Sequence, residues 1–467
     1  MKRSPEASDE EANQIASAAE ALTTSSGGGK DSGALATKSF GSFMSYDPSP
    51  SAAAASPLWP LWSVLGPGLL VCLADTDAGC LIVAAQSGGK WGYSLVWLQV
   101  LLTPITFFTQ ELTIRLAVHT QQGQVACLQQ FYGKPLASFA CFLLVLECVL
   151  AMVSEMSGIA AVAEIWGVGR NIATAGSVCT ILGIVFSCGY KQVELIGITL
   201  GVFELTFVFT MFAFHPSPWE VLQGSVKVSA DADFFQDVAA NIGSVVMPWM
   251  IFFQQSAVVH RGLRGRRAVA QERNSTLLGC VLTQLVMIGT MVTVAAANST
   301  RRDLHSVNDI IADLLPVLGY NTARVLVSLA FLGGSLAASF VVLLAATWSI
   351  CDMLEVSTCS SVNLDDRPTS PVFYGACVLF MVIGVALLET GMDVVSFNML
   401  VEFINGLLFP LTVCSLYFLA TGDALPPSAR VAGREKAALA LVFGLCSFAC
   451  LASTGFGIAN IKGASEH

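Results

Sequence analysis

The chain has 467 residues, of which 54% are hydrophobic and only 12% are charged, with a formal net charge of −10 and a mean hydropathy of +0.68. Soluble globular domains carry roughly 25% charged residues, so this composition excludes an ordinary soluble protein. The acidic balance gives no support to nucleic-acid binding. We therefore expect an all-α integral membrane protein that crosses the bilayer many times.

The chain opens with a polar stretch, residues 1–56, that is rich in Ser, Ala and Gly. No apolar segment follows its first basic residues, so we expect a disordered cytosolic tail rather than a signal peptide. A membrane domain over 57–460 and a short C-terminal tail, 461–467, complete the chain. The domain contains eleven apolar spans, at 58–86, 93–118, 137–165, 172–189, 193–214, 236–260, 275–297, 323–351, 372–390, 394–420 and 435–456.

The basic residues between the spans predict the orientation. With the N-terminus inside, the inner loops hold twelve Lys and Arg and the outer loops hold six, and the run HRGLRGRR at 260–267 is inside. Because inner loops are richer in basic residues, this favours a cytosolic N-terminus. An odd number of spans then places the C-terminus on the opposite side. Asn298 begins an Asn-Ser-Thr sequon in an outer loop, where it is a candidate for glycosylation.

The first span, which contains GPGLLVCLADTDAGCLIVAAQ at 66–86, has two carboxylates near its middle, Asp75 and Asp77. A charged side chain at the bilayer centre costs about 2.5–3.5 kcal/mol, so a simple lipid-facing helix is unfavourable here. A helix that unwinds near Asp77-Ala78-Gly79 would turn its carboxylates and free carbonyls toward a polar cavity. Transporters build cation sites at the bilayer midplane in this way.

The sixth span carries a second expected interruption. Pro248 lies in the middle of AANIGSVVMPWMIFFQQSAVV, residues 239–259. Proline removes a backbone donor and clashes with the preceding turn, so it interrupts a helix. Two interrupted spans, five spans apart, predict an inverted five-plus-five repeat, about 58–214 and about 236–420, with 435–456 as an extra span.

Five residues around these two interruptions are candidate metal ligands: Asp75, Asp77, Cys80, Ser244 and Met247. Carboxylate, hydroxyl and carbonyl oxygens suit Mg²⁺, Ca²⁺ or Mn²⁺. A methionine thioether or a cysteine thiolate would shift the preference toward transition metals. Simple packing also explains the methionine and the cysteine, because both residue types are common in apolar helices.

Further carboxylates lie in the membrane away from the first span. Glu155 in span three is followed by Ser157 and Gly158, which makes it a candidate for an ion path or a gate. Glu402 with Asn405 in span ten is a second candidate, and Glu204 in span five is a third.

At this point the residues resemble a known family. The run GPGLLVCLADTDAG, followed by AAQSGGKWGY, is similar to the first span of the Nramp divalent-metal transporters. The family's Asp-Pro-Gly-Asn motif falls on 77–80, and its Met-Pro-His motif falls on Met247-Pro248-Trp249. The resemblance covers about 57–460 and implies a LeuT-type fold with discontinuous helices 1 and 6.

The departures from the family pattern concern the ligands and the proton route. Cys80 stands where the family has asparagine, and the two histidines of span six are replaced by Trp249 and Gln254, of which Gln254 is a candidate for the ion path or a gate. Glu155 matches a family glutamate, but its aspartate partner is Met152. Together with the extra carboxylate before Asp77, these changes resemble the Nramp-related magnesium transporters, which implies a partly hydrated ion and no proton coupling.

We therefore expect a transporter that moves Mg²⁺, and also Mn²⁺, by alternating access without proton coupling. Its partners would be divalent metal ions and the lipid bilayer, and no cofactor is expected. Enzyme activity is not expected, because no nucleophile–base arrangement is present. Two alternatives remain open, a proton-coupled Mn²⁺/Fe²⁺ symporter of the Nramp type and a Na⁺-coupled organic-solute transporter.

Overall fold

The computed structural model describes residues 66–229, 231–297, 302–355, 370–388 and 393–465, without the side chains of 266 and 454–465. The chain divides into two units, Met1–Pro57 and Leu58–His467, and every described residue belongs to the second. The expected N-terminal tail and the sequon at Asn298 lie outside the described residues.

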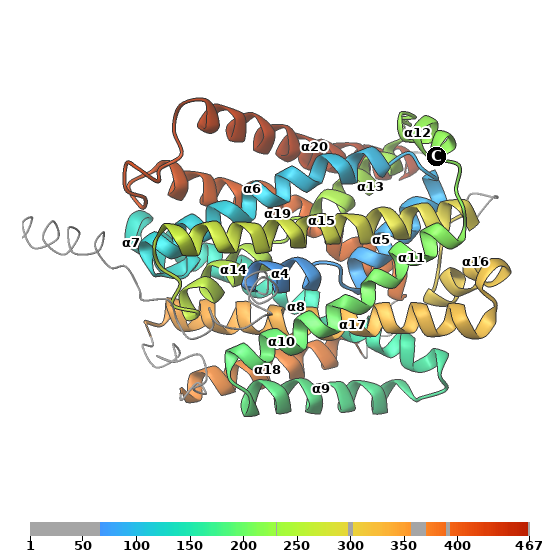
Figure 1. Ribbon diagram of the computed structural model, residues 1–467, viewed down its shortest axis with the longest axis horizontal. Coiled ribbons are helices and arrows are strands. Elements are labelled where there is room, and N and C mark those ends of the chain that lie inside the picture. The colour runs from blue at the N-terminus through green and yellow to red at the C-terminus, as the bar shows by residue number, and fades with distance from the viewer. Residues whose placement is uncertain (1–65, 230, 298–301, 356–369, 389–392, 466–467) are drawn as a thin grey trace, which may run out of the picture. The chain divides into compact units, whose positions relative to one another are not determined.

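Across the described ranges, the regular elements are helices, shown in Figure 1. They are α4 (Pro67–Ala74), α5 (Ala78–Trp91), α6 (Val96–Thr120), α7 (Gln124–Tyr132), α8 (Lys134–Ile165), α9 (Arg170–Ser187), α10 (Tyr190–Gly201), the 3₁₀ helix η2 (Val202–Leu205), α11 (Thr206–Ala213), α12 (Pro218–Ser225), α13 (Ala232–Gly243), α14 (Pro248–His260), α15 (Gly265–Ala297), α16 (Val307–Leu318), α17 (Tyr320–Met353), α18 (Pro371–Leu388), α19 (Val394–Thr421) and α20 (Gly433–Ser465).

Within the described residues, nine helical segments are long and apolar enough to cross a membrane, and the bent pair α4–α5 makes ten. The one predicted span that this set leaves out is the second, 93–118, which corresponds to α6, a 25-residue helix whose sequence includes Glu111 and Arg115. These charged residues form an ion pair one turn apart, with Arg115 Nε 2.6 Å from Glu111 Oε1. Together with Gln99 and Gln110, these charged residues lower the hydropathy of α6.

The first span is broken, as predicted, but the break lies earlier than expected. Helix α4 ends at Ala74, α5 starts at Ala78, and the two halves meet at an angle of 51°. Asp77 has an extended backbone and its carboxylate oxygen accepts a hydrogen bond from Cys80 N at 2.8 Å, so it caps α5. Such a cap starts a helix at the next residue, which is why Ala78 and Gly79 are helical rather than unwound.

The sixth span is also interrupted, between α13 and α14. Met247 is extended, with φ −84° and ψ 148°, and Pro248 is the first residue of α14. Proline suits this position because a first-turn N–H has no helical partner to lose. Both interruptions are buried, and every residue from Ser244 to Trp249 is shielded from solvent.

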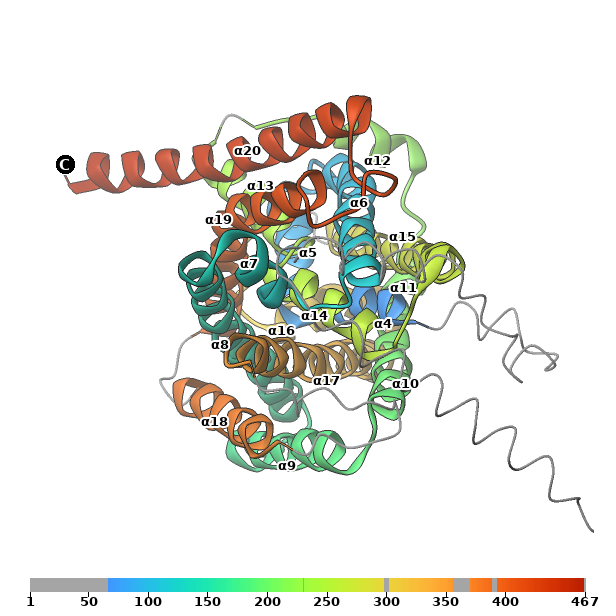
Figure 2. The same ribbon diagram turned by 90° about the vertical axis from the view of Figure 1, so that its left-hand side faces the viewer.

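The two broken spans lie at the centre of the described helices. Helix α15 packs against α4, α5 and α6, and α17 packs against α8, α10 and α14. Helix α19 packs against α13 and α5, one half of each broken span. Figure 2 shows α4, α5 and α14 surrounded by these longer helices. This arrangement places both interruptions where polar groups can face one another away from lipid.

Candidate metal centre

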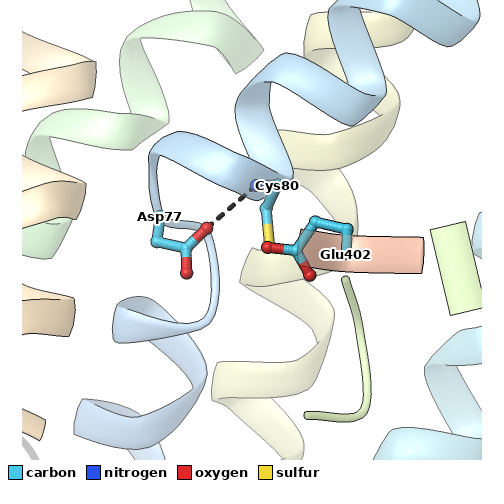
Figure 3. A group of neighbouring side chains, drawn as sticks. All are labelled: Asp77, Cys80 and Glu402. Atoms are coloured by element: carbon cyan, nitrogen blue, oxygen red, sulfur yellow. Dashed lines mark hydrogen bonds between the residues drawn. The ribbon is translucent and has the colours of Figure 1, made fainter. Parts of the chain in front are cut away.

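Three buried side chains meet at the break in the first span: Asp77, Cys80 and Glu402. One ligand atom from each lies within 4.8 Å of the other two. Figure 3 shows Asp77 on the loop before α5, Cys80 in the first turn of α5, and Glu402 reaching them from α19. Two carboxylates and a thiol at this spacing can converge on one divalent cation.

Asp77 is held in place by the helix that it caps. Its Oδ1 accepts from Cys80 N at 2.8 Å, which leaves the second carboxylate oxygen for other partners. The side chain is 1% exposed. The positive end of a helix dipole also lies at this N-terminus, so the ionised carboxylate is favoured there. The same carboxylate is therefore both a helix cap and a candidate ligand.

Glu402 approaches the break because Gly79 leaves room for it. A Cβ atom added at Gly79 would collide with Glu402 Oε1, so any other residue would push the carboxylate away. The other oxygen, Oε2, accepts a hydrogen bond from Asn405 Nδ2 at 3.0 Å. Asn405 therefore orients Glu402 from the next turn of α19. Both residues were predicted for the ion path, and the structure brings Glu402 into the group with Asp77 and Cys80.

The second interruption supplies a backbone contact to the same group. Cys80 Sγ donates to the carbonyl oxygen of Ser244 at 2.9 Å, which links the break in span one to the break in span six. The hydroxyl of Ser244 donates to Asn241 O within its own helix, at 3.1 Å. Met247, the residue before α14, is fully buried in the same interruption. Ser244 and Met247 therefore both lie at the interruption between α13 and α14. Ser244 contacts Cys80 through its backbone carbonyl and not through its hydroxyl.

Asp75 lies outside this group, although it was predicted as a ligand beside Asp77. It follows α4 with helical dihedrals, φ −71° and ψ −25°, whereas Asp77 is extended. Both oxygens of Asp75 are buried without a hydrogen-bond partner.

Of the other two residues predicted for the ion path, Glu155 lies near Asp77 and Gln254 does not. Glu155 on α8 is fully buried and lies beside Asp77 and Ser335. Gln254 instead bridges two helices away from the ligand atoms. It accepts from Thr113 on α6 and donates to Thr276 on α15, each at 3.1 Å. Its position is that of a cross-link between helices.

Glu204 is a further buried carboxylate near the break. It lies in η2, the short 3₁₀ helix that joins α10 and α11 within span five. Its carboxylate is hydrogen-bonded to Thr76, which lies between α4 and α5. Its Oε1 has no hydrogen-bond partner. The sequence indicated this residue only as one membrane carboxylate among several, because its proximity to the break depends on the packing of spans one and five.

The negative charge at this centre has no basic counterpart in the described part of the chain. The ion pairs found there involve other carboxylates, such as Glu111, Glu194 and Asp233. An isolated ionised carboxylate is strongly unfavourable in a low-dielectric interior. A bound cation would therefore supply the positive charge that no basic side chain of the described residues brings to Asp77 and Glu402.

Residues 68–454 match the family model described as natural resistance-associated macrophage protein-like, or Nramp. The chain belongs to the Nramp family. The divalent metal cation transporter MntH of Staphylococcus saprophyticus is 27% identical over 208 residues, which are 43% of this chain and 47% of that protein. The match thus spans about half the length of this relative. Family membership confirms an integral, multi-pass membrane protein and agrees with the expectation that it is not an enzyme.

Solved structures of low sequence identity share the fold. A manganese transporter of Eremococcus coleocola, crystallised with an aromatic bis-isothiourea substituted compound, superposes with a TM-score of 0.68 at 15% identity, over 90% of each chain. Mhp1, a nucleobase-cation-symport-1 family transporter, has a TM-score of 0.52 at 16% identity, over 83% of this Nramp chain and 90% of Mhp1. These likenesses confirm the predicted all-α, LeuT-type fold. They do not distinguish the magnesium branch within the family.

Proposed function

We propose that this Nramp protein transports a divalent metal ion across a membrane by alternating access, with Mn²⁺ as its principal substrate. The observation that carries this proposal is the buried group of Asp77, Cys80 and Glu402 at the break in span one. Carboxylate oxygens bind Mg²⁺ and Mn²⁺ alike, whereas a cysteine thiolate favours transition metals. The names of the similar proteins, a divalent metal cation transporter and a manganese transporter, support the same choice.

Magnesium is the second candidate substrate. Asp75 adds a carboxylate beside the centre, and Trp249 and Gln254 replace the family's histidines in span six. Mg²⁺ keeps several waters and is usually held by one or two carboxylates, which Asp77 and Glu402 can provide. A Na⁺-coupled organic-solute transporter is less compatible with the site, because several buried carboxylates would repel an anionic substrate.

Uptake into liposomes that contain the full chain tests this proposal. We expect Mn²⁺ to enter faster when the interior is negative, because a divalent ion gains about 4.6 kcal/mol per 100 mV. We also expect about a hundredfold excess of Mg²⁺ to leave most of this uptake in place, because an oxygen-preferring ion gains little from the thiol. Liposomes without protein are the control.

The same assay shows whether Mn²⁺ entry is coupled to proton entry. With a pH-sensitive dye inside, the replacement of the two family histidines by Trp249 and Gln254 predicts Mn²⁺ entry without acidification. Acidification in a fixed ratio to Mn²⁺ would instead establish the proton-coupled symporter. Equal competition by Mg²⁺ would establish the magnesium candidate, and no Mn²⁺ uptake above the protein-free control would contradict the proposal.

A further inference from the structure

Helix α4 begins without a side-chain cap of its own. Its N-cap residue is Gly66, which has no side chain, and its first residue, Pro67, has no backbone N–H. Leu70 N donates to Gly66 O at 3.1 Å. The donors that the first turn of α4 leaves to other partners are therefore Gly68 N and Leu69 N.

Both of these donors are paired by side chains of α15. Gly68 N donates to Glu272 Oε1 at 2.5 Å, and Leu69 N donates to Ser275 Oγ at 3.2 Å. Glu272 is 3% exposed and Ser275 is 1% exposed, so these bonds are shielded from water. A carboxylate at a helix N-terminus gains from the helix dipole and from a charge-assisted hydrogen bond. The first turn of α4 is thus capped by a helix that lies 204 residues further along the chain.

The start of α4 fits closely among its neighbours. A Cβ atom at Gly66 would lie 2.7 Å from Glu272 Oε2 and 3.3 Å from Arg261 Nη1, so a larger residue would displace these groups. Arg261 is the C-cap residue of α14, and its Nε lies 3.3 Å from Glu194 Oε2 on α10. Its guanidinium is also within electrostatic range of Glu272. The contact between α4 and α15 is therefore part of a polar cluster that also joins α10 and α14.

We propose that Glu272 and Ser275 form a latch that holds α4 closed over the metal centre. Figure 1 shows α4 and α14 on one side of the two breaks, with α5 and α13 on the other. The side chains of Asp77, Cys80 and Glu402 are at most 1% exposed, so an ion at the centre is closed off from solvent. Opening on the α4 side separates the first turn of α4 from α15 and breaks both bonds of the latch.

The far end of the broken span is held by different residues. Trp91 Nε1 donates to Asp237 Oδ2 at 2.5 Å, and Lys90 Nζ lies 3.2 Å from Asp233 Oδ2. Alternating access requires each side of the site to open while the other is closed. Because the two ends of the span are held by separate contacts, the latch acts on the α4 side alone.

Modification of Cys72 by N-ethylmaleimide measures how often α4 leaves α15. This thiol is fully buried at the contact, with its Sγ 3.7 Å from Cys280 Sγ, so it reacts only when α4 moves away. Peptide mass spectrometry follows the reaction in the full chain in detergent. We expect Glu272→Ala to raise the rate at Cys72 at least about tenfold, because a hydrogen bond to a charged group changes an equilibrium roughly ten- to hundredfold.

Two further variants separate the latch from a general loss of packing. Glu272→Gln keeps an oxygen that can accept from Gly68 N, so we expect a smaller increase than with alanine. Lys90→Gln changes the far end of the broken span, and as the matched control it should not raise the rate at Cys72. The buried thiols of Cys446 and Cys450 on α20 are references within each sample, and their rates should stay unchanged.

An unchanged rate at Cys72 in both Glu272→Ala and Ser275→Ala would overturn the latch. Equal acceleration at Cys72 and at the two α20 thiols would also overturn it, because the fold would then have loosened as a whole. Monodisperse elution from a sizing column shows that each variant is folded.

The role of the latch in opening rests on the proposed transport function, whereas its hold on α4 does not. We expect Glu272→Ala to slow Mn²⁺ uptake into liposomes, because a protein that stays open on one side returns less often to the other. If Cys72 reacts faster in this variant but the unaltered protein takes up no Mn²⁺, the transport proposal fails and the latch stands. If the unaltered protein takes up Mn²⁺ and the variant changes neither rate, the latch fails and the transport proposal stands.

Discussion

Replacing Asp77 with alanine is expected to remove Mn²⁺ binding and uptake. The carboxylate is buried beside Cys80 and Glu402, and its loss leaves a bound ion with one charged ligand fewer in a low-dielectric site. Truncating one partner of a buried charge pair costs about 2–5 kcal/mol, so affinity should fall at least about 30-fold. Calorimetry with Mn²⁺ on the purified variant measures this loss.

Asp77→Asn separates binding from folding in this experiment. Asparagine caps helices about as well as aspartate, so the bond to Cys80 N and the start of α5 should persist. Alanine, in contrast, also loses the cap, at a cost of about 1 kcal/mol in stability. We expect both variants to lose binding and only alanine to lose thermal stability. Normal Mn²⁺ affinity in Asp77→Asn would show that this carboxylate is a cap and not a ligand.

Replacing Glu402 with glutamine is expected to weaken Mn²⁺ binding about tenfold, which corresponds to about 1.4 kcal/mol. The amide keeps the size of the side chain and one oxygen that can accept from Asn405 Nδ2, but it removes the charge and the second acceptor oxygen. Equilibrium affinity distinguishes a ligand from a gate. A gate residue would change the rate of uptake and leave the Kd of the detergent-purified protein unchanged.

Glu147→Gln is the matched control for Glu402→Gln. Glu147 is a fully buried carboxylate on α8, and it is not a member of the group formed by Asp77, Cys80 and Glu402. We expect this variant to bind Mn²⁺ with nearly normal affinity. Equal losses in the two variants would indicate a general effect of buried charge and would argue against a specific ligand at Glu402.

The spans were predictable because a membrane helix needs a long apolar segment. The predicted span 394–420 corresponds to Val394–Thr421, and 372–390 corresponds to Pro371–Leu388. Short helices such as α7 and α16 were not predicted, because their nine and twelve residues are too few to give a membrane signal. Helix α6 was predicted as the apolar span 93–118, although a charged pair near its end lowers its hydropathy.

The position of the candidate site along the chain was predictable, but the set of residues that meet there was not. Two carboxylates in an apolar segment indicate a broken helix, and Pro248 indicates its counterpart. Which of Asp75 and Asp77 faces the site depends on the residue at which the helix stops, because an unwound backbone has no helical periodicity. Glu402 lies more than 300 residues from Asp77 in the sequence, and only the packing of α19 against α5 brings the two together.

The measurement that tests the central claim most directly is the anomalous difference density of Mn²⁺ in crystals of the full chain. The account predicts a peak within about 2.6 Å of ligand atoms from Asp77, Cys80 and Glu402. The Asp77→Asn variant should lack this peak. A peak of full occupancy elsewhere in the helices, with none at these three residues, would contradict the account.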